Sequence, residues 1–375
     1  MVPHAHVVVD PLERFEGQGE SAIVQFAADH IDFIDRELVI QSAYLIPSQE
    51  GLDNMAAMVE RGVRVRLLID DSFLLGQDAI LLEVAHHPNI EYRVFNPYLR
   101  RSSSYATRQA LNLAEFRRLD HRMHNKAFIV DNAMAIVGGR NIGNNYFGVD
   151  AASNFRDLDL AIVGPVVQDV STSFDQFWNS EFAVPISYVV EERLSEQDLQ
   201  EKKSNLYLWV EELEDYPYPI DTTPDDVMAK LKDFREDFIW ATAKIIYDEA
   251  DKPEAKEEEV ADQLILLGKE KDREIIIEAA YVVPGPEGVE RTRINKEKGI
   301  RQRLLTNSLA TNDVAAAHAG YAKYRKGLLR AGVELYEKNT KLTRSQRKEK
   351  KGVGGSSKAS LHAKSFVLDR EKVFI

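Results

Sequence analysis

The chain has 375 residues, 44% of them hydrophobic and 29% charged, which is typical of a globular protein long enough for two domains. A formal net charge of −13 argues against a protein that coats nucleic acid over its whole surface. The lack of cysteine excludes disulfides, thiolate nucleophiles and zinc–thiolate sites.

In chain order, the first predicted elements form a strand–helix–strand unit. Residues 37–45 (ELVIQSAYL) and 63–70 (VRVRLLID) are apolar, β-branched runs that predict strands. Residues 51–62 (GLDNMAAMVERG) have helical spacing and a terminal glycine, so we expect a parallel strand pair with a helix packed on it. Residues 127–139 (AFIVDNAMAIVGG) predict a β-hairpin with Asp131-Asn132 as its turn.

Charge is unevenly distributed along the chain. Residues 98–126 and 341–364 are basic, and each basic stretch runs into a His-x-Lys pattern. A single basic run is most often a solvated loop, but this shared position favours an anionic ligand. Residues 191–265 are acidic and predict a partly helical connector, with a helical piece at 227–246.

Three sequence blocks recur in the same order in the two halves. LVIQSAYLIPSQEG (38–51) matches IIIEAAYVVPGPEG (275–288), ERGVRVRLLIDDS (60–72) matches EKGIRQRLLTNS (297–308), and MHNKAFIVD (123–131) matches LHAKSFVLD (361–369). The period is too long for a solenoid and indicates a duplicated domain. We therefore expect an α/β fold of two similar domains with mixed β-sheets flanked by helices, at 1–190 and 266–375, joined by the connector 191–265.

The His-x-Lys pattern suggests chemistry because residues i and i+2 of a strand share a face. His124 and Lys126 would lie together, as would His362 and Lys364. One copy is weak evidence and is more often structural, whereas two copies at matching places favour a functional site. Two imidazoles and two ammonium groups converging across a pseudo-twofold axis would suit a phosphodiester, without a metal or a cofactor.

Other residues of these segments complete the candidate site. Asp131 and Asp369 lie at the hairpin turns, where they could orient a neighbour or cap the turn, and we count both as candidate catalytic residues. Gly138 and Gly139 allow close backbone approach to a ligand, and Asn141 adds an uncharged amide. Gly139 and Asn141 are the candidate phosphate-binding residues.

H-x-K followed by four residues and Asp, with G-G-x-N six residues later, resembles the repeated motif of the phospholipase D superfamily. Further segments resemble the type C branch of the bacterial cardiolipin synthases: VGGRNIGNNYFG, FRDLDLAIVGPVVQDVSTSFDQFWNS and LTNSLATNDVAAAHAGYAKYRKGLLRAGVELYE. The resemblance covers roughly residues 38–190 and 273–375.

The resemblance implies phosphatidyl transfer between glycerophospholipids, with cardiolipin as the product. His124 would form a phosphatidyl-histidine intermediate, and His362 would act as general acid and then as general base. Lys126, Lys364 and Asn141 would hold the phosphoryl oxygens. The donor would be phosphatidylglycerol or phosphatidylethanolamine, and the acceptor would be phosphatidylglycerol. The sequence does not distinguish between the two donors, and it does not identify a protein partner.

The second motif departs from the family pattern because Asp369 is followed only by REKVFI, without the second Asn. Asn144 stands where aspartate is common in the family, and residues 288–299 form a short helix candidate with little apolar surface. The first departure implies a chain truncated in its second domain, and the other two are compatible with a degenerate, weakly active or inactive copy. The alternatives are a phospholipase D-type hydrolase, a nuclease of the same superfamily, and an inactive fragment.

Localisation follows from the same resemblance. No apolar run reaches the length of a bilayer-spanning helix, and the N-terminal residues lack the basic and apolar regions of a signal peptide. A lipid substrate requires contact with a bilayer, and basic loops near the motifs would be attracted to an anionic surface. We expect peripheral association with a bacterial inner membrane.

Overall fold

The computed structural model describes most of both halves of the chain. The described residues are 4–8, 34, 36–43, 45, 55, 57–71, 87–100, 105–112, 115–119, 121–147, 153–190, 239–250, 259–269, 272–312, 314–338 and 358–375. The chain divides into two compact units: unit 1 comprises 1–137, 141–143 and 160–259, and unit 2 comprises 138–140, 144–159 and 260–375. Residues 144–159 therefore belong to unit 2, whereas the sequence analysis placed them in the first domain.

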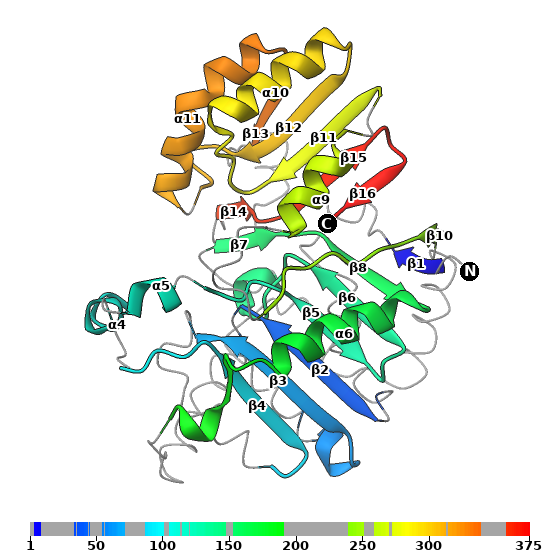
Figure 1. Cartoon of the computed structure of the whole chain (residues 1–375), viewed down its shortest axis with the longest axis vertical. Helices are drawn as coiled ribbons and strands as arrows, with labels where there is room; N and C mark the ends of the chain where they lie inside the picture. Colours follow the sequence, from blue (N-terminus) through cyan, green and yellow to red (C-terminus); the bar gives the residue numbers. More distant parts are fainter. Residues whose placement is uncertain are drawn as a thin grey trace, which may run out of the picture. The chain divides into compact units, whose positions relative to one another are not determined.

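Unit 1 is built on a mixed sheet. Its strands are β1 (His4–Val8), β2 (Glu37–Ser42), β3 (Arg64–Asp70), β4 (Ile90–Phe95), β5 (Ala127–Val130), β6 (Met134–Gly138), β8 (Asp159–Val163), β9 (Ala183–Pro185) and β10 (Ile239–Thr242). In the part that the structure describes, their order is β10-β1-β8-β6-β5-β2-β3-β4-β9 (Figure 1). Strands β2, β3 and β4 are parallel, and β5 pairs antiparallel with both β2 and β6.

Both faces of the central strands are buried, as expected of parallel strands. Leu38 and Leu67 contribute to a core that includes Met58, which lies in the helical residues 57–60. On the other face, Val39 and Leu68 pack in the core that contains the apolar side chains of α6 (Val166–Trp178). The predicted strand–helix–strand unit is thus confirmed in its described part.

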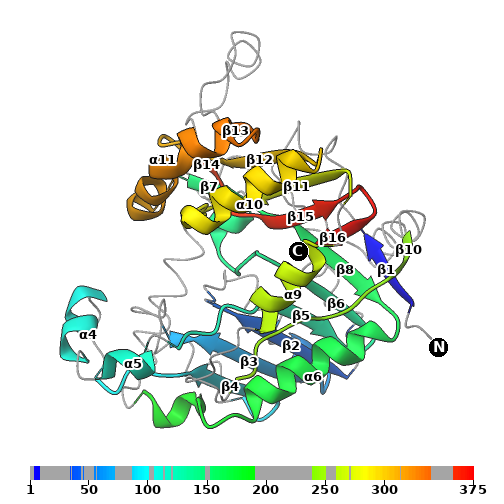
Figure 2. The ribbon, with the colours of Figure 1, turned by 45° about the horizontal axis from the view of Figure 1, so that its top comes forward.

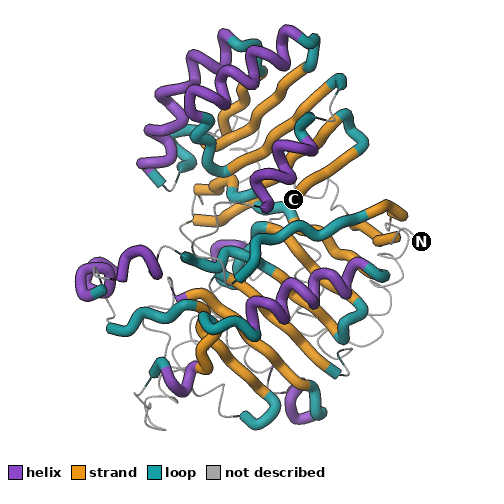
Figure 3. Tube along the Cα trace, viewed as in Figure 1, coloured by secondary structure: helices purple, strands orange, loops and turns teal. Residues whose placement is uncertain are grey.

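Shorter helices complete unit 1. They are α4 (Tyr105–Leu111), α5 (Phe116–Leu119) and the 3-10 helix η6 (Ile186–Tyr188). Figure 3 shows α4 and α5 as short helices (purple), distinct from the strands of the sheet (orange). Both helices lie in the stretch that leads from β4 to the first His-x-Lys segment.

Unit 2 repeats the pattern on a smaller sheet. Its elements are η5 (Asn144–Tyr146), β7 (Ser153–Arg156), α9 (Glu259–Leu267), β11 (Glu274–Ala279), α10 (Gly285–Glu297), β12 (Arg301–Asn307), α11 (Ala315–Arg330), β13 (Glu334–Lys338), β14 (Lys358–Leu361), β15 (Lys364–Leu368) and β16 (Lys372–Phe374). The sheet order is β13-β12-β11-β15-β16, and β14 pairs in parallel with β7 from the first half of the chain. Figure 2 shows α10 and α11 covering one face of this sheet, where Leu304 and Tyr321 form part of the core.

Both predicted hairpins are present, and their turns have the same backbone geometry. Asp131 and Asn132 have φ angles of 52° and 55°, and Asp369 and Arg370 have φ angles of 54° and 61°. The tight two-residue turn whose twist matches that of the paired strands requires a positive φ angle at both residues. Asn tolerates this conformation better than Arg does, so the turn of unit 2 carries more backbone strain.

Two expectations about helices have different outcomes. The prediction of a helix at 227–246 is wrong for residues 239–242, which form β10 and pair with β1. Residues 227–238 lie outside the described residues. The short helix before the second central strand is present as α10, and none of its side chains is fully buried. Among the described residues, no helix combines the length and apolar character that crossing a membrane would need.

Candidate functional site

The first His-x-Lys pair lies at the entrance to β5 in unit 1. The Lys126 Nζ atom is 2.9 Å from Nδ1 of His124 and donates to the His124 carbonyl oxygen at 2.7 Å. An ammonium group can only donate, so its contact with Nδ1 requires a lone pair there and hence a neutral imidazole. The imidazole is exposed and the lysine is half-buried. The expectation that these two side chains share a face is confirmed by this contact.

A buried carboxylate at the end of β3 holds the chain just before His124. Asp70 accepts a hydrogen bond from the Met123 backbone N–H at 2.9 Å and lies 3.3 Å from Nε of Arg122. Unit 2 has a matching anchor, because Asn307 accepts from the Leu361 N–H at 2.9 Å and donates to the Leu361 carbonyl at 2.8 Å. Asp70 and Asn307 occupy the same position in the repeated blocks, so both copies fix the residue before the histidine.

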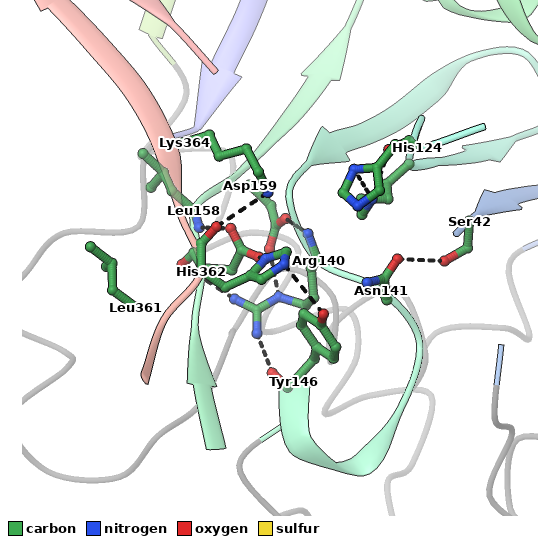
Figure 4. A network of polar contacts seen from close by, with 12 residues as sticks. Ser42, His124, Arg140, Asn141, Tyr146, Leu158, Asp159, Leu361, His362 and Lys364 are labelled. Atoms are coloured by element: carbon green, nitrogen blue, oxygen red, sulfur yellow. Dashed lines mark hydrogen bonds and ion pairs between the residues drawn. The ribbon is translucent and has the colours of Figure 1, made fainter. Parts of the chain in front are cut away.

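Asn141 lies at the same end of the first sheet. It is buried, and its Oδ1 atom accepts a hydrogen bond from the hydroxyl of Ser42 at 3.2 Å (Figure 4). Ser42 follows Gln41, which pairs with Ala127 across β2 and β5, so Ser42 lies at the level of Lys126. The amide and the ammonium are therefore held at one edge of the same sheet.

The second histidine has a different environment within unit 2. Nδ1 of His362 lies 2.6 Å from Oδ2 of Asp157, and both side chains are buried. The His362 backbone N–H donates to the carbonyl of Arg156 at 2.7 Å, which fixes the ring beside Asp157. Because the carboxylate accepts from Nδ1–H, Nε2 is left as the nitrogen that can exchange a proton.

Aromatic rings enclose the same imidazole. The Tyr146 ring meets it edge-on with centroids 5.2 Å apart, and the Phe155 ring lies at 5.3 Å. The Tyr146 hydroxyl is 3.4 Å from Nε2 (Figure 4). Lys364 begins β15 and donates to the His362 carbonyl at 3.4 Å. Tyr146, Phe155 and Asp157 all come from the first half of the chain.

The glycine pair lies against two buried carboxylates. A Cβ atom on Gly139 would lie 2.3 Å from Oδ1 of Asp157, and one on Gly138 would lie 2.3 Å from Oδ1 of Asp159. The pair thus makes room for two carboxylates of its own chain. Gly139 lies against Asp157, the partner of His362, and its predicted contact with phosphate stays a prediction.

Asp159 completes this buried polar cluster. Its Oδ2 atom accepts from Nε of Arg140 at 2.6 Å, and Arg140 also donates to the Tyr146 carbonyl (Figure 4). Burial raises the pKa of Asp159, and the neighbouring Asp157 adds to this effect, whereas Arg140 opposes it. The ion pair connects the segment after the glycines to η5, which carries Tyr146 next to His362.

Asp131 and Asp369 cap their hairpin turns, and their catalytic role stays a prediction. Oδ1 of Asp131 accepts from the backbone N–H groups of Arg36 and Glu37, at 2.8 Å each. In unit 2, Oδ1 of Asp369 accepts from Arg273 and Glu274 at 2.8 and 2.7 Å. Both carboxylates tie a hairpin turn to the start of the neighbouring central strand. The turn lies beyond the far end of β5, roughly 13 Å of strand from the His124 end.

Asp157 was missed by the sequence analysis. The sequence feature that could have identified Asp157 is its pairing with Asp159. These two residues share one face of an extended segment and stand opposite two glycines that leave space for them. His124, Lys126 and Asn141 belong to unit 1, whereas His362 and Lys364 belong to unit 2. The expected convergence of the two histidines stays a prediction. Among the described residues, no group of three or more His, Asp or Glu side chains is arranged to hold a metal ion.

Comparison with known proteins places these observations in context. Residues 29–178 match the family model described as cardiolipin synthase, PLD-like domain. Cardiolipin synthase C of Escherichia coli (strain K12) is 39% identical over 328 residues, which are 86% of this chain and 67% of that protein. An uncharacterized protein of Helicobacter pylori (strain J99) is 31% identical over 341 residues, again 86% of this chain and 63% of that protein.

A solved structure supports the fold. The phosphatidylserine synthase of Haemophilus influenzae Rd KW20 superposes with a TM-score of 0.54 at 13% sequence identity, covering 98% of this chain and 78% of that one. At this identity the match concerns the fold alone, and it agrees with the α/β architecture of mixed sheets flanked by helices. The chain spans about two thirds of the length of the two sequence relatives.

Proposed function

The chain belongs to the cardiolipin synthase family of phospholipase D-like proteins, and on that premise we propose that it is a phosphatidyltransferase of the cardiolipin synthase type. Family membership supports a phospholipid phosphatidyltransferase. The observation that carries the proposal is the buried contact between His362 and Asp157, which prepares one imidazole for proton transfer. The neutral imidazole of His124 beside Lys126 supplies a complementary nucleophile.

In the first half of the proposed reaction, Lys126 turns from Nδ1 of His124 to a phosphoryl oxygen, and the lone pair of Nδ1 attacks the phosphorus atom of a phosphatidyl donor. A P–N bond forms, the P–O bond to the head-group alcohol breaks, and the leaving oxygen takes a proton from Nε2 of His362. Asp157 holds the tautomer of His362 that has Nε2 available and stabilises the imidazolium. The result is a phosphatidyl-histidine intermediate and a neutral imidazole at His362.

In the second half, the hydroxyl of an acceptor lipid gives its proton to Nε2 of His362 and attacks the same phosphorus atom. The P–N bond breaks and His124 is released. Lys126, Lys364 and Asn141 are proposed to hold the phosphoryl oxygens, which gain charge in both transition states. With phosphatidylglycerol as the acceptor, the product is cardiolipin. Phosphatidylglycerol and phosphatidylethanolamine are the proposed donors.

A head-group assay tests this proposal. The full chain is incubated with phosphatidylglycerol in mixed micelles, and the products are resolved by mass spectrometry. Cardiolipin and free glycerol are the expected products. Phosphatidic acid in place of cardiolipin would identify water as the acceptor and a hydrolase instead. Cleavage of single-stranded DNA with no lipid product would favour a nuclease, and no turnover of either substrate would leave an inactive fragment.

The intermediate can be sought in a variant that lacks the proton donor. His362→Ala with phosphatidyl-p-nitrophenol, whose leaving group needs no acid, should release nitrophenolate once and retain the phosphatidyl group. Peptide mapping should then find the added mass on His124. A label on any other residue, or full turnover in His124→Ala, would contradict the assignment of the nucleophile.

Membrane association is part of the same proposal. A lipid-transfer reaction needs access to a bilayer, and kinship with cardiolipin synthases supports membrane association. We propose that the protein associates peripherally with a bacterial inner membrane. Fractionation of cells into membrane and supernatant, followed by a high-salt wash, separates peripheral attachment from stronger anchoring.

A further inference from the structure

A lobe of unit 1 carries two exposed leucines. This α4–α5 lobe consists of the described residues of 96–122, and Figures 1 and 2 show its helices projecting from the sheet near the carboxyl ends of β3 and β4. Leu99 is 74% exposed and Leu111 is 43% exposed. Leaving such side chains in water is unfavourable relative to burying them.

The two leucines are held near each other by Asn112. Its carboxamide accepts from the Arg100 backbone N–H at 3.1 Å and donates to the Arg100 carbonyl at 2.8 Å. The Arg100 guanidinium in turn donates to the Leu111 carbonyl at 3.4 Å. The residue after Leu99 is therefore bound to the residue after Leu111, so the two exposed leucines lie on neighbouring backbone segments of the lobe.

A buried ion pair makes this display rigid. Arg108 of α4 lies 3.3 Å from Oδ1 of Asp71, and both side chains are fully buried. The other carboxylate oxygen of Asp71 accepts from the Tyr98 backbone N–H at 2.7 Å. Asp71 directly follows β3, so the segment before Leu99 and the helix before Leu111 are both fixed to the end of a core strand. The leucines are exposed because the fold holds them there.

The charge of the lobe is opposite to that of the whole chain. Residues 98–122 contain six arginines but only two acidic residues, Glu115 and Asp120, in a chain whose net charge is −13. The Arg100 side chain is exposed beside the leucines. Exposed leucines beside an exposed arginine suit a surface with anionic head groups over an apolar layer, and both kinds of contact contribute to binding there.

The lobe is also linked to the first histidine segment. The Asn96 side chain donates to the carbonyls of Arg118 and His121, at 2.7 and 2.6 Å. Arg122 donates to the Asn96 carbonyl at 2.5 Å and forms an ion pair with Asp70, which anchors Met123 next to His124. A lipid surface held by the lobe would thus lie near the end of the sheet that carries His124.

We infer that the α4–α5 lobe is the docking surface of this protein for an anionic phospholipid bilayer, with Leu99 and Leu111 entering the interface and Arg100 contacting lipid phosphates. The inference rests on the proposed function for the identity of the surface. Vesicle binding is measured without turnover, so a protein that binds but transfers no lipid would refute the proposed function and leave the lobe's assignment intact.

Flotation with lipid vesicles tests the inference. The full chain should bind vesicles that contain phosphatidylglycerol and phosphatidylcholine, more weakly with rising salt, and should bind pure phosphatidylcholine far less. Leu99→Ser with Leu111→Ser should lower the partition coefficient at least about ten-fold. The matched control is Leu309→Ser with Leu329→Ser, because these leucines of unit 2 are 72% and 53% exposed. An equal loss in both double variants would overturn the assignment to the lobe.

The charge contribution has its own matched pair. Arg100→Gln should weaken binding to the anionic vesicles about five-fold, the equivalent of about 1 kcal/mol, and should flatten the salt dependence. Arg291→Gln, which removes an exposed arginine from α10, should leave the binding unchanged. Equal effects of the two arginine substitutions would indicate attraction to net charge alone and would overturn the inference.

A tryptophan reporter gives a direct readout. Leu99→Trp should show a blue-shifted emission on addition of anionic vesicles and quenching by brominated acyl chains, after subtraction of the wild-type signal. Leu309→Trp should show neither change. An unshifted spectrum for Leu99→Trp with bound vesicles would overturn the inference. The inference would also be overturned if Leu99→Ser with Leu111→Ser changed the oligomeric state and left vesicle binding unchanged. That result would identify a protein contact.

Discussion

His362 and Asp157, which are 205 positions apart in the chain, form a buried contact with 2.6 Å between Nδ1 and Oδ2. The carboxylate reaches the second histidine because residues 144–159 of the first half fold into unit 2 and because β7 pairs with β14. The duplicated halves are therefore not independent copies. The second histidine depends on a segment that the first half supplies.

This contact predicts the effect of replacing Asp157. Asp157→Asn keeps the size of the side chain but can present an N–H to Nδ1, which favours the tautomer with the proton on Nε2. We expect kcat to fall roughly 10²- to 10⁴-fold, as for other imidazoles that lose a carboxylate partner, with little change in KM. Steady-state kinetics of phosphatidyl transfer measure both constants.

The control for this variant is Asp169→Asn, which changes an exposed carboxylate on α6. Its kcat should stay within about two-fold of the wild-type value. A structural role of Asp157 would lower thermal stability and expressed protein without changing kcat per folded molecule. That result would remove Asp157 from the proposed mechanism.

Gly139 provides a second test, because its contact with Asp157 predicts that the two residues act as one. Gly139→Ala places a methyl group where the Asp157 carboxylate now lies, at 2.3 Å from Oδ1. The carboxylate must move, so the variant should lose activity as Asp157→Asn does. The double variant should be no slower than the slower single variant, because the contact can be lost only once. Multiplied losses would instead support a separate contact of Gly139 with the substrate phosphate.

A third prediction separates structural from catalytic aspartates. Asp131→Ala removes two charge-assisted hydrogen bonds to the backbone of β2 and its preceding residue, and should lower the free energy of unfolding by about 1–3 kcal/mol. The kcat of the folded fraction should stay within about two-fold of the wild-type value. Thermal unfolding and active-site-normalised kinetics measure the two effects, and a selective loss of kcat would support the catalytic interpretation.

Asp369 adds a pH dependence to the same argument. Hydrogen bonds from the backbone N–H groups of Asp272 and Glu274 lower the pKa of this carboxyl group. The ionised form is thus favoured in the folded state, and its stabilisation is present above the unfolded pKa of about 3.9 and is lost as the pH falls toward the folded value. Hydrogen exchange of residues 272–280 should be slower in wild type than in Asp369→Asn at pH 6. The difference should shrink below about pH 4, and a constant difference would contradict the role of the charge.

The sequence predicts the local elements well because their signals are local. The apolar periodicity of 37–70, the Asp131-Asn132 turn and the His124–Lys126 pair depend on neighbours within a few residues. Residues 239–242 were wrongly predicted to be helical because a short apolar run does not distinguish strand from helix. Pairing with β1 decides the outcome, and β1 lies more than 200 positions away.

The site shows the same division. The motif draws attention to His124, Lys126 and His362, whose catalytic roles stay predictions, but it does not tell which of its side chains cap a turn at the other end of the sheet. Asp131 follows its histidine by seven positions, and the strand carries it to the opposite end of the sheet. Asp157 has no periodicity or motif spacing of its own relative to His362, so only the fold identifies it as a partner.

A last prediction concerns a buried charge of unit 2 that has no counterpart in unit 1. Lys338, the last residue of β13, pairs with Asn307 in the sheet, and the corresponding position of unit 1 is the buried Phe95. Within the described part of the chain, its Nζ atom is buried without a hydrogen-bond partner. Burial and the nearby Arg156 lower the pKa of Lys338 to about 8, which Glu278 partly opposes. Burial and Asp157 raise the pKa of Glu278.

The depressed pKa of Lys338 fixes the sign of a stability change. Between about pH 8 and pH 10 the unfolded lysine keeps its proton, whereas the folded one has lost it, so the free energy of unfolding rises with pH in this window.

Lys338→Met with Glu278→Gln removes both buried charges. The double variant should be at least as stable as wild type at pH 7, and its stability should vary less from pH 8 to pH 10. Urea denaturation measures this, and the lack of cysteine avoids thiol oxidation at alkaline pH. Lys326→Met, on the exposed side of α11, should keep the wild-type slope, and an equal slope in all three proteins would show that Lys338 is not the group that titrates.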